Sequence, residues 1–202
     1  MIEIIFEDPY LMIVNKPSGL LVIPTPKNEK NTLTNKLNEI LLKRNESVKD
    51  HPCHRLDRDT SGLIIYAKGK SVQQKMMTLF HENHVSKKYF AIASGYIDKK
   101  EGTINFRIEG KTAITKYKVI EQNENYTVVE IELLTGRTNQ IRIHFKDIGH
   151  PLLGETKFAF RKDFKIKFKR LALHSHSIEF THPVTNEKMF FNIPMPDEFI
   201  IS

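Results

Sequence analysis

HRLDRDTSGLIIYAK, residues 54–68, joins a charged turn directly to an apolar segment. Residues 63–67 are apolar, rich in β-branched and aromatic side chains, and follow a glycine, which predicts a buried strand. Charged side chains are rarely placed beside a core unless they are paired or functional. The turn is therefore a candidate active-site loop, and its charged residues are Arg55, Asp57, Arg58 and Asp59.

A simple turn is the alternative explanation of this stretch. The short polar side chains of residues 59–62 can bond the local backbone, with Asp57 and Arg58 solvated beside them. However, HRLD followed two residues later by TSG resembles the signature of the RluA-like pseudouridine synthases. In that family the aspartate at the position of Asp57 is catalytic, so the resemblance implies that Asp57 is the nucleophile.

Two further segments resemble motifs of the same family. Residues 87–95, KKYFAIASG, resemble the motif whose tyrosine packs on the target base and has been considered for proton transfer, which implies that role for Tyr89. Residues 134–144, LTGRTNQIRIH, resemble the motif whose arginine pairs with the catalytic aspartate, which implies that role for Arg137. The chain departs from the pattern at Asn139, where most relatives have histidine, so proton transfer is not expected there.

Substrate or RNA contacts are expected from other residues of these motifs and from Lys16, whose lysine-proline turn resembles the family's opening segment. Arg55 is expected to fill the space left by an extruded base. The full set is Lys16, His54, Arg55, Arg58, Thr60 and Arg142. Smaller departures from the family occur at Glu155, where aspartate is usual, and at Phe158, where tyrosine is usual.

Working outward, the pattern predicts an α+β protein with a mixed, largely antiparallel central sheet flanked by helices, the pseudouridine synthase fold. Helical spacing covers residues 31–45, 71–83 and 138–149, with Thr32 and Thr138 as caps and Gly149 ending the third helix. At 202 residues, one catalytic domain spanning 1–202 is expected. Strands are predicted on either side of Asp8-Pro9, at 20–23, 63–67, 87–95, 103–108, 113–121, 127–134, 170–180 and 190–194.

The net charge of +7 is concentrated in one place. Residues 157–170 carry seven Lys or Arg against Asp163 alone, and phenylalanines are interleaved with them. Alternation at residues 164–168 predicts a strand with its aromatic side chains in the core and its lysines in water. Such a basic ridge neutralises phosphates, so it predicts polyanion binding that weakens steeply with salt.

Composition limits the classes of protein to which the chain can belong. A lone cysteine excludes an internal disulfide, and no apolar run is long enough to span a membrane. We expect a cytoplasmic monomer that acts on tRNA or rRNA without a cofactor. Because only nineteen residues precede Leu20, the form of the family without an N-terminal S4 domain is expected.

Three other functions compete with this interpretation. A non-catalytic RNA-binding module explains the basic charge. It does not explain why a carboxylate lies among the arginines, because a carboxylate on an RNA-binding surface would repel phosphate. Glycoside hydrolysis needs a second carboxylate across the sugar, and Asp59 is poorly placed for that. Zinc usually needs four suitably spaced ligands, so we predict no metal at the two histidine clusters: His51, Cys53 and His54, and His174 and His176.

Overall fold

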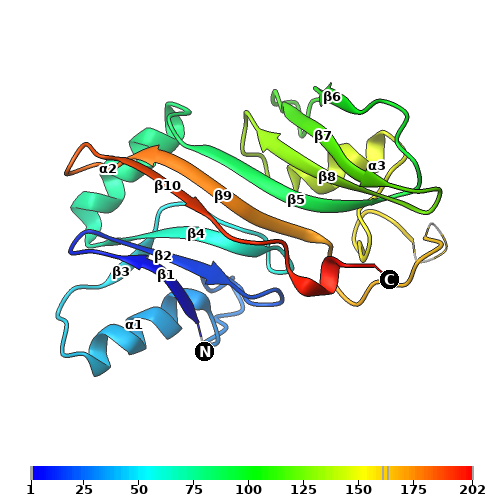
Figure 1. The fold of residues 1–202 in the computed structure, drawn as a ribbon. Helices are drawn as coiled ribbons and strands as arrows, with labels where there is room; N and C mark the ends of the chain where they lie inside the picture. Colours follow the sequence, from blue (N-terminus) through cyan, green and yellow to red (C-terminus); the bar gives the residue numbers. More distant parts are fainter. Residues whose placement is uncertain (1, 161, 163, 202) are drawn as a thin grey trace. The chain divides into compact units, whose positions relative to one another are not determined.

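The computed structural model describes residues 2–160, 162 and 164–201, which form two compact units. Unit 1 consists of the described residues up to Val85 together with Ile178–Ile193. Unit 2 consists of the described residues in Ser86–Ser177 and those from Pro194 onward. One strand, β9 (Leu173–Thr181), contributes residues to both (Figure 1).

Unit 1 is built on antiparallel strands with two helices. Strand β2 pairs with β1 and β4, β3 pairs with the other edge of β4, and β10 pairs with β9. The bounds are β1 Glu3–Glu7, β2 Leu11–Lys16, α1 Leu33–Lys43, β3 Asp50–Pro52, β4 Ser61–Lys68, α2 Lys70–His81 and β10 Lys188–Asn192. As predicted, Thr32 caps α1, where its side-chain oxygen accepts a hydrogen bond from the Asn35 N–H.

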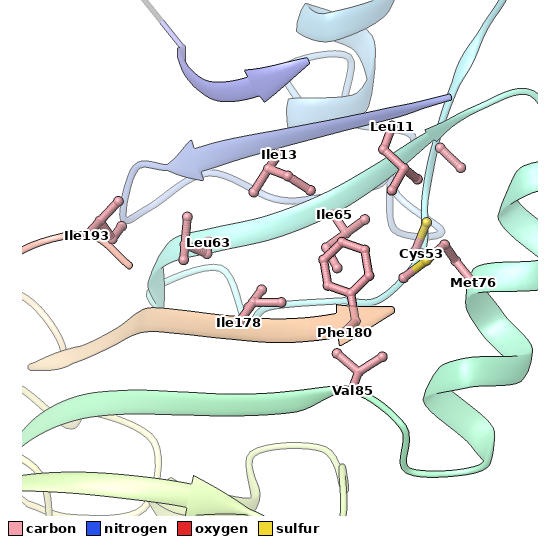
Figure 2. Close-up of a cluster of buried hydrophobic side chains, with 11 residues drawn as sticks. Leu11, Ile13, Cys53, Leu63, Ile65, Met76, Val85, Ile178, Phe180 and Ile193 are labelled. Atoms are coloured by element: carbon pink, nitrogen blue, oxygen red, sulfur yellow. The ribbon is translucent and has the colours of Figure 1, made fainter. Parts of the chain in front are cut away.

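The core of unit 1 lies on one face of these strands (Figure 2). Alternate residues of β2 and β4 point into it because side chains of a strand alternate between the two faces. Helix α2 adds Met76 and the chain beyond residue 177 adds Phe180. The buried members are Leu11, Ile13, Cys53, Leu63, Ile65, Ala67, Met76, Val85, Ile178, Phe180 and Ile193.

Unit 2 contains four antiparallel strands in the order β5-β8-β7-β6, with α3 packed against β7. The Phe145 ring of α3 lies 5.8 Å from the Tyr117 ring of β7, and Gly149 follows the helix with φ +83°, as predicted. The bounds are β5 Ser86–Ser94, β6 Glu101–Ile104, β7 Thr115–Gln122, β8 Tyr126–Leu133, α3 Gln140–Asp147 and the 3-10 turn η2 Asp197–Phe199. The predicted α+β class with a mixed, largely antiparallel sheet is confirmed.

Three local predictions were wrong. Residues 20–23 do not form a strand, because the carbonyls of Leu21 and Val22 instead accept the first N–H groups of α1. Thr138 does not cap α3; the N-cap is Asn139, in the left-handed conformation at φ +54°. Residues 164–168 form no strand ladder, although Phe164, Ile166 and Phe168 do pack against the core. The short strand β3 was not anticipated.

Within the part of the chain that the structure describes, we found no helix with the length and apolar character needed to cross a membrane.

Candidate active site

The loop that carries Asp57 is anchored by a buried lysine. Lys16, at the end of β2, is 0 % exposed, and its ammonium donates hydrogen bonds to three backbone carbonyls. Two belong to its own turn, Pro17 at 3.0 Å and Leu20 at 2.7 Å, and the third is Arg58 at 2.9 Å. A buried ammonium needs such acceptors to offset its desolvation, so Lys16 fixes the turn and the Asp57 loop together.

Further hydrogen bonds join the same two segments. The Gly19 N–H donates to the Arg58 carbonyl at 2.9 Å, and the Arg58 Nε donates back to the Gly19 carbonyl at 3.2 Å. The Ser18 hydroxyl donates to the Asp59 carbonyl at 2.7 Å. The backbone directly after the catalytic candidate is therefore held, which preorganises its side chain.

Exposure separates the residues of this loop. Arg55 and Arg58 are exposed, and Asp57 is half-buried. Leu56, between them, is buried and anchors the loop in unit 1. The two arginines can therefore reach a polyanion, whereas the carboxylate is partly shielded from water.

Of the residues expected to contact substrate or RNA, Lys16 and Thr60 are buried and His54 is half-buried. Lys16 is used as described above. His54 Nε2 accepts the Ile65 N–H at 3.1 Å, which requires its neutral form, and its ring lies 4.7 Å from that of Phe80. Thr60 is buried beside the loop, with its N–H donating to the Asp57 carbonyl at 3.2 Å. These side chains support the loop from within, and their contact with substrate stays a prediction.

In unit 2, the turn before α3 is organised by Gln140. Its side-chain carbonyl accepts the Arg137 N–H at 2.9 Å, and its amide donates to Ile114 and Thr115 at the start of β7. Arg137 is itself exposed, with its Nε donating to the Thr112 carbonyl at 2.9 Å. The buried amide thus fixes the backbone of this turn while the arginine head group stays accessible.

Arg142, in the first turn of α3, is the second guanidinium of this motif, and it is buried. Its Nε and one terminal nitrogen each lie 2.7 Å from a Glu155 oxygen, a bidentate pair, and the other terminal nitrogen donates to Asn139 at 3.0 Å. Burial alone would raise the pKa of the Glu155 carboxyl, but Arg142 and the Lys157 N–H hold that pKa below its ordinary value. The pair is therefore ionised at neutral pH.

The comparisons with known proteins agree with these motifs. Residues 10–147 match the RNA pseudouridylate synthase family, and this segment includes the Asp57 loop, Tyr89 and Arg137. The chain belongs to this family. It is an RNA pseudouridine synthase, an isomerase.

Curated relatives extend the match over nearly the whole synthase. An uncharacterised RNA pseudouridine synthase of Bacillus subtilis, YlyB, is 36 % identical over 98 % of this chain and 70 % of its own length. The dual-specificity RNA pseudouridine synthase RluA of Haemophilus influenzae is 34 % identical over 95 % of this chain and 92 % of its own length. The human RNA pseudouridylate synthase domain-containing protein 1 supports the fold, with a TM-score of 0.82 at 24 % identity over 99 % of this chain and 85 % of its own.

Lys87 is a charged residue of the synthase that sequence analysis did not single out. Burial lowers the pKa of its ammonium, and a side-chain carbon at Gly136 would lie 3.9 Å from its Nζ. The residue thus lies beside the turn that carries Arg137. A lysine two residues before Tyr89, in the predicted strand 87–95, was the available signal. Tyr89 itself is buried on β5 opposite Ile131.

The two histidine clusters do not resemble metal centres. Burial raises the pKa of the Cys53 thiol to about 12, and the thiol lies in the apolar core of unit 1. Burial also lowers the pKa of His174 to about 4, and the His176 ring stacks on Phe90 with centroids 3.7 Å apart. Over the described residues, no three His, Cys, Asp or Glu side chains are grouped to bind a metal ion.

Proposed function

We propose that this synthase converts specific uridines of structured tRNA or rRNA to pseudouridine with Asp57 as its nucleophile. The observation that carries the assignment is the Asp57 loop. Its backbone is clamped by the buried Lys16 ammonium and the 17–20 turn, while the Asp57 carboxylate is kept half-buried between exposed arginines. Preorganised support of one carboxylate is what a nucleophile needs, and a simple surface turn does not require it.

The proposed reaction can be carried out by protein side chains. The bond from N1 of uracil to C1′ of ribose breaks, the base turns, and a bond from C5 to C1′ forms, with the C5 proton released to a base and N1 protonated. Because substrate and product are isomers, no other reagent is consumed. Asp57 can attack the sugar or the base, or stabilise a charged sugar.

The target base has to leave its stack before Asp57 can reach it, which costs a few kcal/mol. We assign Tyr89 to packing on the flipped base and Arg55 to filling the space that the base leaves. Arg55 is exposed, so its side chain is available for that task.

We assign Arg137 as the ion-pair partner of Asp57 on family resemblance. Its guanidinium is exposed, whereas the three guanidinium nitrogens of Arg142 already donate to Glu155 and Asn139. Arg137→Lys keeps the charge but loses the bidentate geometry, so conversion should fall while RNA affinity is retained. Full conversion by this variant would contradict the assignment.

The experiment that tests the proposal is a pseudouridine map of unmodified tRNA and rRNA transcripts incubated with pure protein, without cofactor. Wild type is compared with Asp57→Ala and with Asp59→Ala, a matched change in the same turn. Conversion of specific sites by wild type and Asp59→Ala, with none by Asp57→Ala and unchanged RNA affinity, supports the assignment. Loss of RNA affinity together with conversion in Asp57→Ala would favour an RNA-binding role for this residue instead.

The transcripts also decide between the substrate classes. Relatives of this chain include the dual-specificity synthase above and large-subunit rRNA synthases, such as pseudouridine synthase D of Haemophilus influenzae at 34 % identity over 98 % of this chain and 69 % of its own length. We further propose that the synthase works as a cytoplasmic monomer. Light scattering of the free protein and of its RNA complex tests the oligomeric state.

A further inference from the structure

The basic loop, residues 155–170, is the largest concentration of charge that the mechanism does not use. Its first residues are fixed to α3. The Glu155 Oε1 atom accepts the N–H groups of Thr156, Lys157 and Phe158 at 2.9, 2.7 and 3.3 Å. The Arg142 guanidinium lies 5.2 Å from the centre of the Phe158 ring. The loop therefore starts from the same ion pair that stands behind the Arg137 turn.

The end of the basic loop returns to its start. Gly154 packs against the Arg170 carbonyl so closely that an added Cβ would clash with it, and the Ala172 N–H donates to the Leu153 carbonyl at 2.9 Å. Arg170 also pairs with Glu198 and lies 4.7 Å from the centre of the Phe199 ring. A long segment whose two ends meet is an Ω-loop, a type of loop that is frequently functional.

Aromatic side chains hold the second half of the basic loop on unit 2. Phe164, Ile166 and Phe168 are partly buried against the cluster of Ile92, Tyr126, Val128, Leu153, Ala172 and Phe199. The residues that alternate with them, Lys165, Lys167 and Lys169, are exposed. Packing of one side of the chain therefore directs three ammonium groups to the other side.

An aromatic ring is exposed on the same loop. Phe160 is 74 % exposed, the highest value among the large apolar residues that the structure describes, and the Lys162 ammonium lies 5.7 Å from its ring centre. A ring that is exposed to this extent contributes little to the hydrophobic core. It does match a nucleobase, whose face stacks on an aromatic ring while the adjoining phosphates contact lysines. Arg161 and Asp163 belong to this stretch of sequence and lie outside the described residues.

We propose that the basic loop is a second RNA-binding element of the synthase, which holds unpaired nucleotides outside the target uridine. Lys165, Lys167 and Lys169 contact successive phosphates, and Phe160 stacks on a base. Single-stranded RNA fits better than duplex, because bases within a duplex are already stacked on one another and do not offer a face to Phe160. This inference rests on the proposed action on RNA.

The test measures binding rather than turnover, so that its failure is separate from failure of the catalytic assignment. The probes are a short single-stranded RNA and the same strand annealed to its complement. The variants are Phe160→Ala and the triple change Lys165→Gln, Lys167→Gln and Lys169→Gln. Their matched controls are Phe190→Ala, another exposed phenylalanine, and Lys43→Gln, Lys49→Gln and Lys75→Gln, three exposed lysines of unit 1. Thermal melts of all variants verify folding.

For single strands each phosphate contact contributes a salt slope of roughly 0.7, so the triple variant should lower the slope by about 2 and affinity by about 100-fold at about 0.1 M salt. Phe160→Ala should weaken single-strand binding at least about fivefold, with little change for duplex. The controls should bind like wild type. An unchanged salt slope in the triple variant overturns the proposal, as does a Phe160→Ala protein that binds single strands normally. Equal losses for single strand and duplex would overturn the assignment to unpaired RNA.

Discussion

The Asp57 loop of unit 1 and the Arg137 turn of unit 2 each lie next to a buried cation, but the two cations have different partners. Lys16 donates to three backbone carbonyls, which are neutral dipoles and do not titrate. Arg142 donates to the Glu155 carboxylate, which does. The difference teaches that the backbone bonds of Lys16 do not change with pH, whereas the bond of Arg142 to Glu155 depends on the charge of an acid.

The largest effect is expected for Arg142→Met. Removing the guanidinium leaves the Glu155 carboxylate buried with only backbone donors, and breaking one side of a buried pair typically costs about 3–5 kcal/mol. Urea unfolding at neutral pH should show a loss of this order. The double variant with Glu155→Gln is the control, because it removes the unpaired charge and should recover part of the loss. A single variant as stable as wild type would show that the pair is not a structural support.

Lys16→Met tests the other support and should cost about 3 kcal/mol. Three carbonyls lose a charged donor, and the bond to the Leu20 carbonyl is the buried one, whereas the Arg58 carbonyl keeps the Gly19 N–H. Lys27→Met, at an exposed position of the same unit, should leave the unfolding free energy unchanged. If both variants unfold alike, the carbonyls near Lys16 are satisfied in another way.

Unit 1 also contains a buried acid, Asp50, which within the described part of the chain has no hydrogen bonds of the kind that Arg142 donates to Glu155. Burial raises the pKa of Asp50 to about 6 from 3.8, and neither of its carboxylate oxygens has a hydrogen-bond partner among the described residues. Because the folded state binds this proton more tightly, Asp50 lowers stability above its folded pKa, and the penalty disappears as the pH falls toward 3.8.

Asp50→Asn should therefore stabilise the protein by about 2 kcal/mol at neutral pH and by much less in acid. Unfolding free energies measured across the range from mildly acidic to neutral pH provide the test. Asp98→Asn, an exposed aspartate, is the matched control and should change nothing. A gain that is the same at every pH would argue against a titration effect.

Glu155 should show the opposite pH dependence. Its pKa is lowered in the folded state, so its stabilising effect is complete above the ordinary value of 4.5 and is lost as the pH falls through the folded pKa. In acid, wild type should lose stability more steeply than Glu155→Gln. Parallel curves for the two proteins would show that the Arg142 pair does not respond to pH.

The smallest effect is expected for Ser18→Ala. This change removes one hydrogen bond, from the hydroxyl to the Asp59 carbonyl at 2.7 Å, and leaves Lys16 in place. The expected loss is about 1 kcal/mol. A double-mutant cycle with Lys16→Met would show whether the two bonds act as one support.

The sequence predicted most of the fold because alternation and helical spacing report which face of an element is buried. Both helices of unit 1 and strands β4, β5 and β8 were found close to their expected bounds. The errors arose where the backbone is bonded by groups that periodicity does not describe. Leu21 and Val22 look like a strand but hydrogen-bond the start of α1.

For the candidate site, the sequence showed which residues carry charge, but it did not show which of them are buried. Lys16, Arg58 and Arg142 all look like phosphate ligands in a basic sequence, yet Lys16 and Arg142 are interior and Arg58 is exposed. A cation is buried when carbonyls or a carboxylate from distant parts of the chain converge on it. The distance in sequence between Lys16 and Arg58 is what hid this from sequence reasoning.

The division of the chain has a consequence for its synthesis. The core of unit 1 needs Ile178, Phe180 and Ile193, and the core of unit 2 needs Phe199, although both units begin far earlier. Neither can complete its packing while these residues are still inside the ribosome. Both cores therefore stay incomplete until the chain up to Phe199 has left the ribosome, and until then chaperones meet a nascent protein with two unfinished cores.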